Sequence, residues 1–182
     1  NWGVTWDLTD IYTWGGVTAA YDSVNNEYRV IGLVINQDAR REAQGYISPR
    51  VGDLPYLMLI SAAGDGLRCE LSEKMFRLPY LQDVTLVLNI NSELPGFVFQ
   101  APSLEYLYLF NSGIYGELPE EIAEWDNPNG YCFLTRNHLT GKVPSGIQIG
   151  ALWLDENEYT SYPYEYCFAD LPQISMRNNP IY

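Results

Sequence analysis

The sequence holds few residues that carry metal or redox chemistry. Its 182 residues include 3 cysteines and 1 histidine. No Cys-x-x-Cys pair occurs, which argues against a zinc or redox centre of that kind, and an odd cysteine count argues against a complete disulfide framework. Cys132 takes the place of a strand leucine, so we expect a buried, small apolar residue there. We predict no bound metal and no cofactor.

Positive charge is also scarce. The chain has 10 lysines and arginines against 23 aspartates and glutamates, which gives a formal net charge of −13. This charge argues against binding to nucleic acid or to anionic membranes, and it fits a partner with basic patches. No apolar run approaches the roughly 18 residues of a membrane span, so we expect no membrane insertion by this chain.

Residues suited to catalysis are few. The histidine, His138, stands beside a turn asparagine, and no convincing Cys–His pair is present. The Gly64-Asp65-Gly66 segment lacks the lysine of a phosphate-binding loop. Glu105, Asp155 and Glu156 are candidate carboxylates for glycosidic chemistry, but a sequence does not measure the separations of about 5–10 Å that this chemistry needs. We predict a protein that is not an enzyme, with no catalytic residue.

What the sequence does contain is a repeated apolar pattern. The clearest copy spans residues 104–119 and reads Leu-x-x-Leu-x-Leu-x-x-Ser-x-Ile-x-Gly-x-Leu-Pro. A strand of period two puts Leu107 and Leu109 on one face, with Tyr106, Tyr108 and Phe110 on the other. One such unit cannot bury its own leucines, but a stack of units can.

The pattern recurs along the chain at about seven places, with a period of roughly 20–27 residues, which is the range of leucine-rich repeats. The polar residues that anchor the successive copies after their strands are Asp38, Asp65, Asn89, Ser112, Asn137, Asn157 and Asn179. An asparagine at this point can bond to backbone groups that the turn leaves unpaired. We therefore expect these anchors to be structural, not catalytic.

The chain resembles leucine-rich-repeat proteins of the subtype with Leu-x-Gly-x-Ile-Pro in each repeat. Ile114–Pro119 and Leu139–Pro144 are its clearest copies. The subtype is familiar from plant extracellular receptors and inhibitors, and similar repeats occur in surface proteins of gut-type bacteria. Trp14–Val17 ahead of Arg29–Leu33 resembles its N-terminal cap, but without the cysteine pairs of plant caps. Together with the absence of an Asn-x-Ser/Thr sequon, this favours a bacterial surface or secreted member.

The resemblance implies an α/β fold, namely a right-handed leucine-rich-repeat solenoid (horseshoe). A parallel concave β-sheet faces convex loops, 3-10 turns and short helical turns in such a fold. We assign residues 1–29 to the N-terminal cap and residues 30–182 to about seven repeats, together one domain. We expect a short helix on the convex side at 120–125, and at 162–171 a convex segment rich in aromatic residues that covers the last repeats. We also expect a monomer, secreted or at the cell surface, with any signal or anchor outside this sequence.

The concave face is predicted to carry a cluster of aromatic rings. Aligned repeats put Tyr108, Phe133 and Trp153 side by side, because adjacent parallel strands lie about 4.8 Å apart. Neighbouring positions surround them with further rings, which gives a platform about 10–15 Å across by the same spacing. The candidate ligand-binding residues are Tyr106, Tyr108, Phe110, Tyr131, Phe133, Trp153, Asp155 and Arg177.

Two roles for these rings remain open. They can stiffen the sheet by cross-strand packing, or they can form an exposed patch that binds a ligand. We favour recognition of a protein or peptide through the concave face. The alternatives are carbohydrate binding by the same aromatic rings, since ring faces suit sugars, or a rigid structural or adhesion module of a larger surface protein. The identity of the ligand does not follow from a repeat scaffold.

Overall fold

A computed structural model describes residues 15–36, 44–168 and 173–182. These residues form a large sheet and a small sheet of two strands. The large sheet starts with an antiparallel hairpin of β1 (Val17–Asp22) and β2 (Glu27–Asn36). A turn joins these strands, and the Asp22 carboxylate accepts hydrogen bonds there from the backbone N–H groups of Val24 and Asn25. The first fourteen residues of the predicted cap lie outside the described residues.

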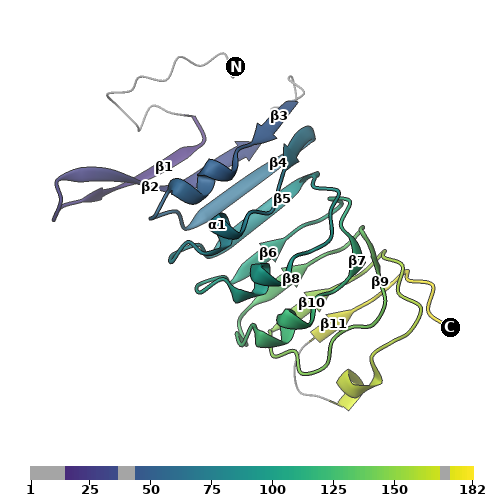
Figure 1. The fold of residues 1–182 in the computed structure, drawn as a ribbon. Coiled ribbons are helices and arrows are strands. Elements are labelled where there is room, and N and C mark those ends of the chain that lie inside the picture. Colours follow the sequence, from purple (N-terminus) through teal and green to yellow (C-terminus); the bar gives the residue numbers. More distant parts are fainter. Residues whose placement is uncertain (1–14, 37–43, 169–172) are drawn as a thin grey trace.

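Parallel strands extend the sheet in chain order from this hairpin to the C-terminal end of the molecule (Figure 1). The order is β1-β2-β4-β5-β6-β8-β10-β11, and β3 pairs with β4 beside this path. The predicted parallel sheet is therefore present. The strands after the hairpin are β3 (Gln44–Ile47), β4 (Leu59–Cys69), β5 (Asp83–Asn89), β6 (Tyr106–Tyr108), β8 (Tyr131–Phe133), β10 (Ala151–Trp153) and β11 (Gln173–Ser175).

Short helical turns connect the strands and lie along one side of the sheet (Figure 1). Pro95 and Pro119 directly precede two of them, in extended conformations. Proline suits this place because it cannot donate to a strand ladder. The short helix predicted at 120–125 is confirmed as a 3-10 turn, and the described part of the segment 162–171 also holds a 3-10 turn. The turns are η2 (Pro49–Asp53), α1 (Glu73–Phe76), η3 (Gly96–Gln100), η4 (Glu120–Glu124) and η5 (Tyr164–Phe168).

The core runs between the sheet and the helical turns. Alternate strand residues point into it, as the period-two pattern predicts, and Leu107, Leu109 and Cys132 are fully buried. The helical turns add Phe99 and Ile122 from the other side. Because each repeat contacts mainly its neighbours, the core is one continuous strip.

The predicted anchors are confirmed in the C-terminal half, whereas the anchor positions in β4 and β5 are not buried. Asn89 still donates to a neighbouring backbone carbonyl, that of Asp65, and Asp38 lies outside the described residues. Asn137 and Asn157 are buried and bond to backbone groups of neighbouring strands. Asp65 and Asn89 are exposed instead. Strands β4 and β5 continue past the point where the later strands end, so both residues still belong to a strand and point outward.

The Leu-x-Gly-x-Ile-Pro segments form the small sheet. β7 (Tyr115–Glu117) and β9 (His138–Thr140) pair in parallel. Gly141 directly follows β9 with φ +75, a left-handed backbone that favours glycine. A Cβ atom at this position would lie 2.5 Å from the Glu117 side chain of the preceding repeat. The motif glycine therefore allows the repeats to stack closely.

Candidate functional site: an aromatic platform on the large sheet

Three neighbouring strands carry an aromatic residue at the same register position. Tyr108 on β6, Phe133 on β8 and Trp153 on β10 are paired in register, as predicted. The rings of Phe133 and Trp153 stack with 4.1 Å between centroids and 4° between planes. The rings of Tyr108 and Phe133 lie 5.2 Å apart and are tilted by 48°.

A second row stands beside the first. Tyr106 and Tyr131 stack at 5.3 Å and 6°, and Tyr131 also stacks with Trp153 at 6.1 Å. Phe110 joins the group through Tyr108, at 6.1 Å. The structure thus brings together all the aromatic residues predicted for the site. We call this group the aromatic platform: Tyr106, Tyr108, Phe110, Tyr131, Phe133 and Trp153.

Several rings of the aromatic platform stack face to face, and the platform rings stay partly exposed. Rings on adjacent strands are nearly parallel at Phe133–Trp153 and Tyr106–Tyr131, so their faces point along the row of strands. Each stacked pair adds about 0.5–1.5 kcal/mol beyond area burial. No platform ring is fully buried, and Tyr106 is 43% exposed. The rings therefore pack on one another and also remain partly accessible.

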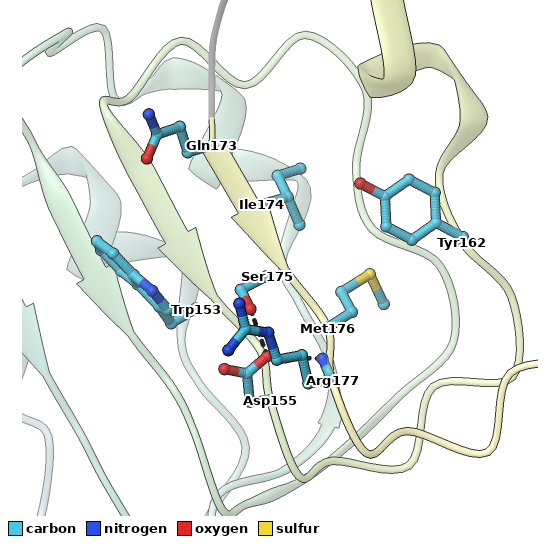
Figure 2. Close-up of a pocket in the computed structure, with 8 residues that line it drawn as sticks. All are labelled: Trp153, Asp155, Tyr162, Gln173, Ile174, Ser175, Met176 and Arg177. Carbon is cyan, nitrogen blue, oxygen red and sulfur yellow. Dashed lines mark hydrogen bonds between the residues drawn. The ribbon is translucent and has the colours of Figure 1, made fainter.

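Charged residues lie at one end of the platform. Asp155 follows Trp153 by two residues, and its Oδ1 accepts hydrogen bonds from Ser175 Oγ and from the Arg177 backbone N–H, both at 2.6 Å (Figure 2). Within the described residues the Arg177 guanidinium forms no ion pair. The two predicted polar residues, Asp155 and Arg177, thus stand beside the aromatic platform.

An ion pair lies next to Phe110 of the platform. Arg136 Nε lies 2.8 Å from Glu156 Oε2, and the Arg136 guanidinium lies 5.3 Å from the centre of the Phe110 ring. Both side chains are largely exposed, so the pair contributes little to stability.

A hollow of about 540 Å³ opens beside Trp153, at the edge strand β11 (Figure 2). Gln173 and Ser175 line this hollow but were not among the candidate ligand-binding residues. The feature that could have indicated the hollow is the small side chain of Ser175, which is in register with the large side chain of Trp153. The hollow is lined by Trp153, Asp155, Gln173, Ser175 and Arg177 on the platform side, and by Tyr162, Ile174 and Met176 toward the core.

The thiols of the core are not suited to nucleophilic chemistry. Burial raises the pKa of the Cys132 thiol far above its ordinary value and raises the pKa of Cys69 to about 11, so both stay protonated at neutral pH. Among the described residues, no cluster of three or more His, Cys, Asp or Glu side chains is arranged to hold a metal ion.

Comparison by sequence gives no relative: no protein-family model and no curated protein matches the chain. Comparison by structure does. The chain is similar to a plant ice-binding protein (TM-score 0.70, 21% identity over 92% of this chain). It is also similar to the LRR ectodomain of the membrane receptor kinase GASSHO1/SCHENGEN3 from Arabidopsis thaliana in complex with CASPARIAN STRIP INTEGRITY FACTOR 2 (TM-score 0.73, 22% identity over 92% of this chain). The chain has a leucine-rich-repeat fold.

A third similar structure is the LRR ectodomain of the Arabidopsis receptor kinase HAESA in complex with an IDA peptide hormone ligand (TM-score 0.61, 21% identity over 75% of this chain). The stacked parallel strands and few helices of this chain fit a leucine-rich-repeat solenoid. The chain spans 62% of the ice-binding protein, 20% of the GASSHO1 ectodomain and 24% of the HAESA ectodomain. Among the described residues, no helix has the length and apolar character needed to cross a bilayer.

Proposed function

We propose that this chain is a non-enzymatic recognition module that binds a protein or peptide through the aromatic platform. The observation that carries the proposal is that register gathers the platform rings on one face and leaves them partly exposed. Exposed aromatic clusters of this kind usually mark interaction sites, and aromatic side chains dominate the energetics of such sites. The HAESA structure, whose ectodomain holds a peptide, supports the same use of the fold.

Charge supports a basic partner. The chain carries a net charge of −13, which attracts basic segments over a distance and speeds their encounter at low salt. Asp155 places one negative charge directly at the platform.

The finer features belong to the same proposal. We propose that the platform face is the concave side of a right-handed horseshoe, and that the repeats belong to the Leu-x-Gly-x-Ile-Pro subtype. Residues 1–29 form the cap, and residues 30–182 form about seven repeats. We propose a monomer that is secreted or displayed at a bacterial cell surface.

The test compares two double variants with the parent chain. Tyr108→Ala with Trp153→Ala removes two platform rings, and Tyr115→Ala with Tyr164→Ala removes two exposed rings away from the platform. Random peptides displayed on phage are selected on the parent chain, and their affinities are measured by calorimetry. We expect micromolar binders that lose at least about tenfold in affinity for the platform variant and less than about twofold for the control.

Circular dichroism and urea midpoints check that both variants are folded. Equal binding to both variants would overturn the platform as the site. Binding to a glycan array in place of peptides would replace the proposal with a carbohydrate ligand. Failure to obtain any ligand, with the platform variant clearly less stable than the control, would favour a structural or adhesion module.

A further inference from the structure

Among the residues that the structure describes, the aromatic platform ends in one ring face that no other ring covers. Phe133 stacks on one face of the Trp153 indole at 4.1 Å. The opposite face points toward β11, where the residue in register is Ser175. A serine side chain is too short to cover an indole, and the hollow of about 540 Å³ begins at this point (Figure 2).

A carboxylate oxygen at the rim of the hollow is available to a ligand. The Oδ1 atom of Asp155 accepts both internal hydrogen bonds, from Ser175 Oγ and from the Arg177 backbone N–H. Within the described residues, no hydrogen bond or ion pair engages its Oδ2 atom. Internal bonds thus hold the carboxylate in place beside the indole, with one oxygen left to accept.

We propose that this hollow binds an arginine side chain of the ligand, an inference that rests on the proposed peptide recognition. A planar guanidinium stacks on the free indole face of Trp153, where cation–π attraction is strongest. From that position its N–H groups donate to Asp155 Oδ2 in a charge-assisted hydrogen bond. Gln173 lines the other end of the hollow and offers an amide oxygen to a remaining N–H group.

The effect of removing Arg177 distinguishes an arginine ligand from a sugar or an acidic side chain. Its guanidinium lines the same hollow, and it repels an incoming cation. Its bond to Asp155 comes from the backbone, so Arg177→Ala keeps the carboxylate in place. We expect this substitution to strengthen arginine binding. For a sugar or an acidic side chain, Arg177 is a donor, and the same substitution would weaken binding.

The experiment uses the full chain labelled with ¹⁵N and follows the indole N–H signal of Trp153, which Trp153→Phe identifies by its loss. The probes are N-acetyl-arginine amide and its neutral isostere N-acetyl-citrulline amide. We expect a saturable shift with the arginine probe and affinity on the order of tenfold lower for the citrulline probe. We expect Asp155→Asn, which keeps an Oδ1 acceptor, to lower arginine affinity by about tenfold and to abolish the preference over citrulline.

The matched control is Glu156→Gln, one residue away, whose carboxylate pairs with Arg136 outside the hollow. It should change arginine affinity by less than about twofold, whereas Arg177→Ala should raise it by about two- to fivefold. Equal binding of the two probes, or weaker binding after Arg177→Ala, would overturn the inference. A methyl glucoside that shifts the same signal when the arginine probe does not would replace it with a sugar subsite.

The two proposals fail separately. Selected peptides that need the platform rings but show no arginine preference would overturn the arginine subsite alone. An arginine probe that binds at Trp153, with no peptide selected by the platform, would overturn peptide recognition alone.

Discussion

At the scale of single residues, a buried amide ties neighbouring repeats together. Asn137 Oδ1 accepts from the backbone N–H groups of Ser112 at 3.1 Å and Ile114 at 3.0 Å. Its Nδ2 donates to the carbonyl oxygens of Leu109 at 2.7 Å and Leu134 at 2.9 Å. One side chain thus forms hydrogen bonds with buried backbone groups of two repeats. These groups would otherwise be unpaired, because the short strands end there.

We predict that Asn137→Ala lowers the free energy of unfolding by about 3 kcal/mol or more, because buried donors and acceptors lose their partner. Asn89→Ala is the matched control: Asn89 is exposed and donates to a single carbonyl, that of Asp65. It should cost less than about 1 kcal/mol. Urea denaturation followed by circular dichroism measures both, and similar midpoints for the two variants would contradict the structural role assigned to Asn137.

This contrast marks how far single residues could be predicted. The chemistry of asparagine and the repeat spacing identified Asn137 and Asn157 as anchors, and the burial of Cys132 followed from its place among strand leucines. Asn89 was misplaced because spacing alone does not tell where a strand ends. The hollow at Trp153 was missed because it depends on how far a neighbouring side chain reaches, which the pattern of apolar and polar residues does not encode.

At the scale of elements, the four short strands β6, β8, β10 and β11 of the large sheet are each followed by a residue in the left-handed region, directly before the anchor position. The residues are Asn111, Arg136, Glu156 and Asn178, with φ of 49, 59, 53 and 57. Asparagine adopts this conformation readily, whereas arginine and glutamate do so at some cost. The two asparagines could therefore be predicted as turn residues from the sequence. Arg136 and Glu156 could not, because the geometry of the repeat overrides their local conformational preference.

Two glycines that follow β9 allow a test of how closely neighbouring repeats stack. Gly141 and Gly146 both have left-handed φ, +75 and +78, but a Cβ at Gly141 would lie 2.5 Å from Glu117, whereas the nearest atom to a Cβ at Gly146 is 4.0 Å away. We predict that Gly146→Ala costs about 1–2 kcal/mol from backbone strain alone, and that Gly141→Ala costs at least about 1 kcal/mol more from the clash.

Thermal denaturation of the two variants measures this difference. Adding Glu117→Ala to Gly141→Ala should recover the excess and bring the variant to the level of Gly146→Ala. If Glu117→Ala restores nothing, the contact between neighbouring repeats does not limit what this position accepts.

At the scale of the whole molecule, we expect repulsion among like charges to outweigh the ion pairs. The net charge is −13. Most ion pairs among the described residues, such as Arg136–Glu156, are largely exposed and worth about 0–1 kcal/mol each. We predict that raising sodium chloride from 10 mM to 500 mM stabilises the chain by about 1 kcal/mol, or about 2–4 °C in Tm, because salt screens the repulsion. A fall in Tm would show that the ion pairs dominate.

The repeat period and the register of the strands could be read from the sequence because both follow from apolar spacing. Tyr106, Tyr108, Tyr131, Phe133 and Trp153 lie where that spacing puts them. The length of β4 and its pairing with β3 could not be predicted from the sequence. Apolar residues keep alternating to the end of this long strand, so the pattern does not mark where the strand ends.

The spacing of the stacked rings also limits how many of them an extended peptide can contact. Neighbouring strands repeat at about 4.8 Å, whereas side chains on one face of an extended peptide recur about every 6.7 Å. A peptide laid across β6, β8 and β10 therefore falls out of step with the rings after its first anchor. The row of rings therefore contacts one side chain of the peptide closely and the others less well. Lengthening a peptide ligand adds contact area faster than it adds affinity.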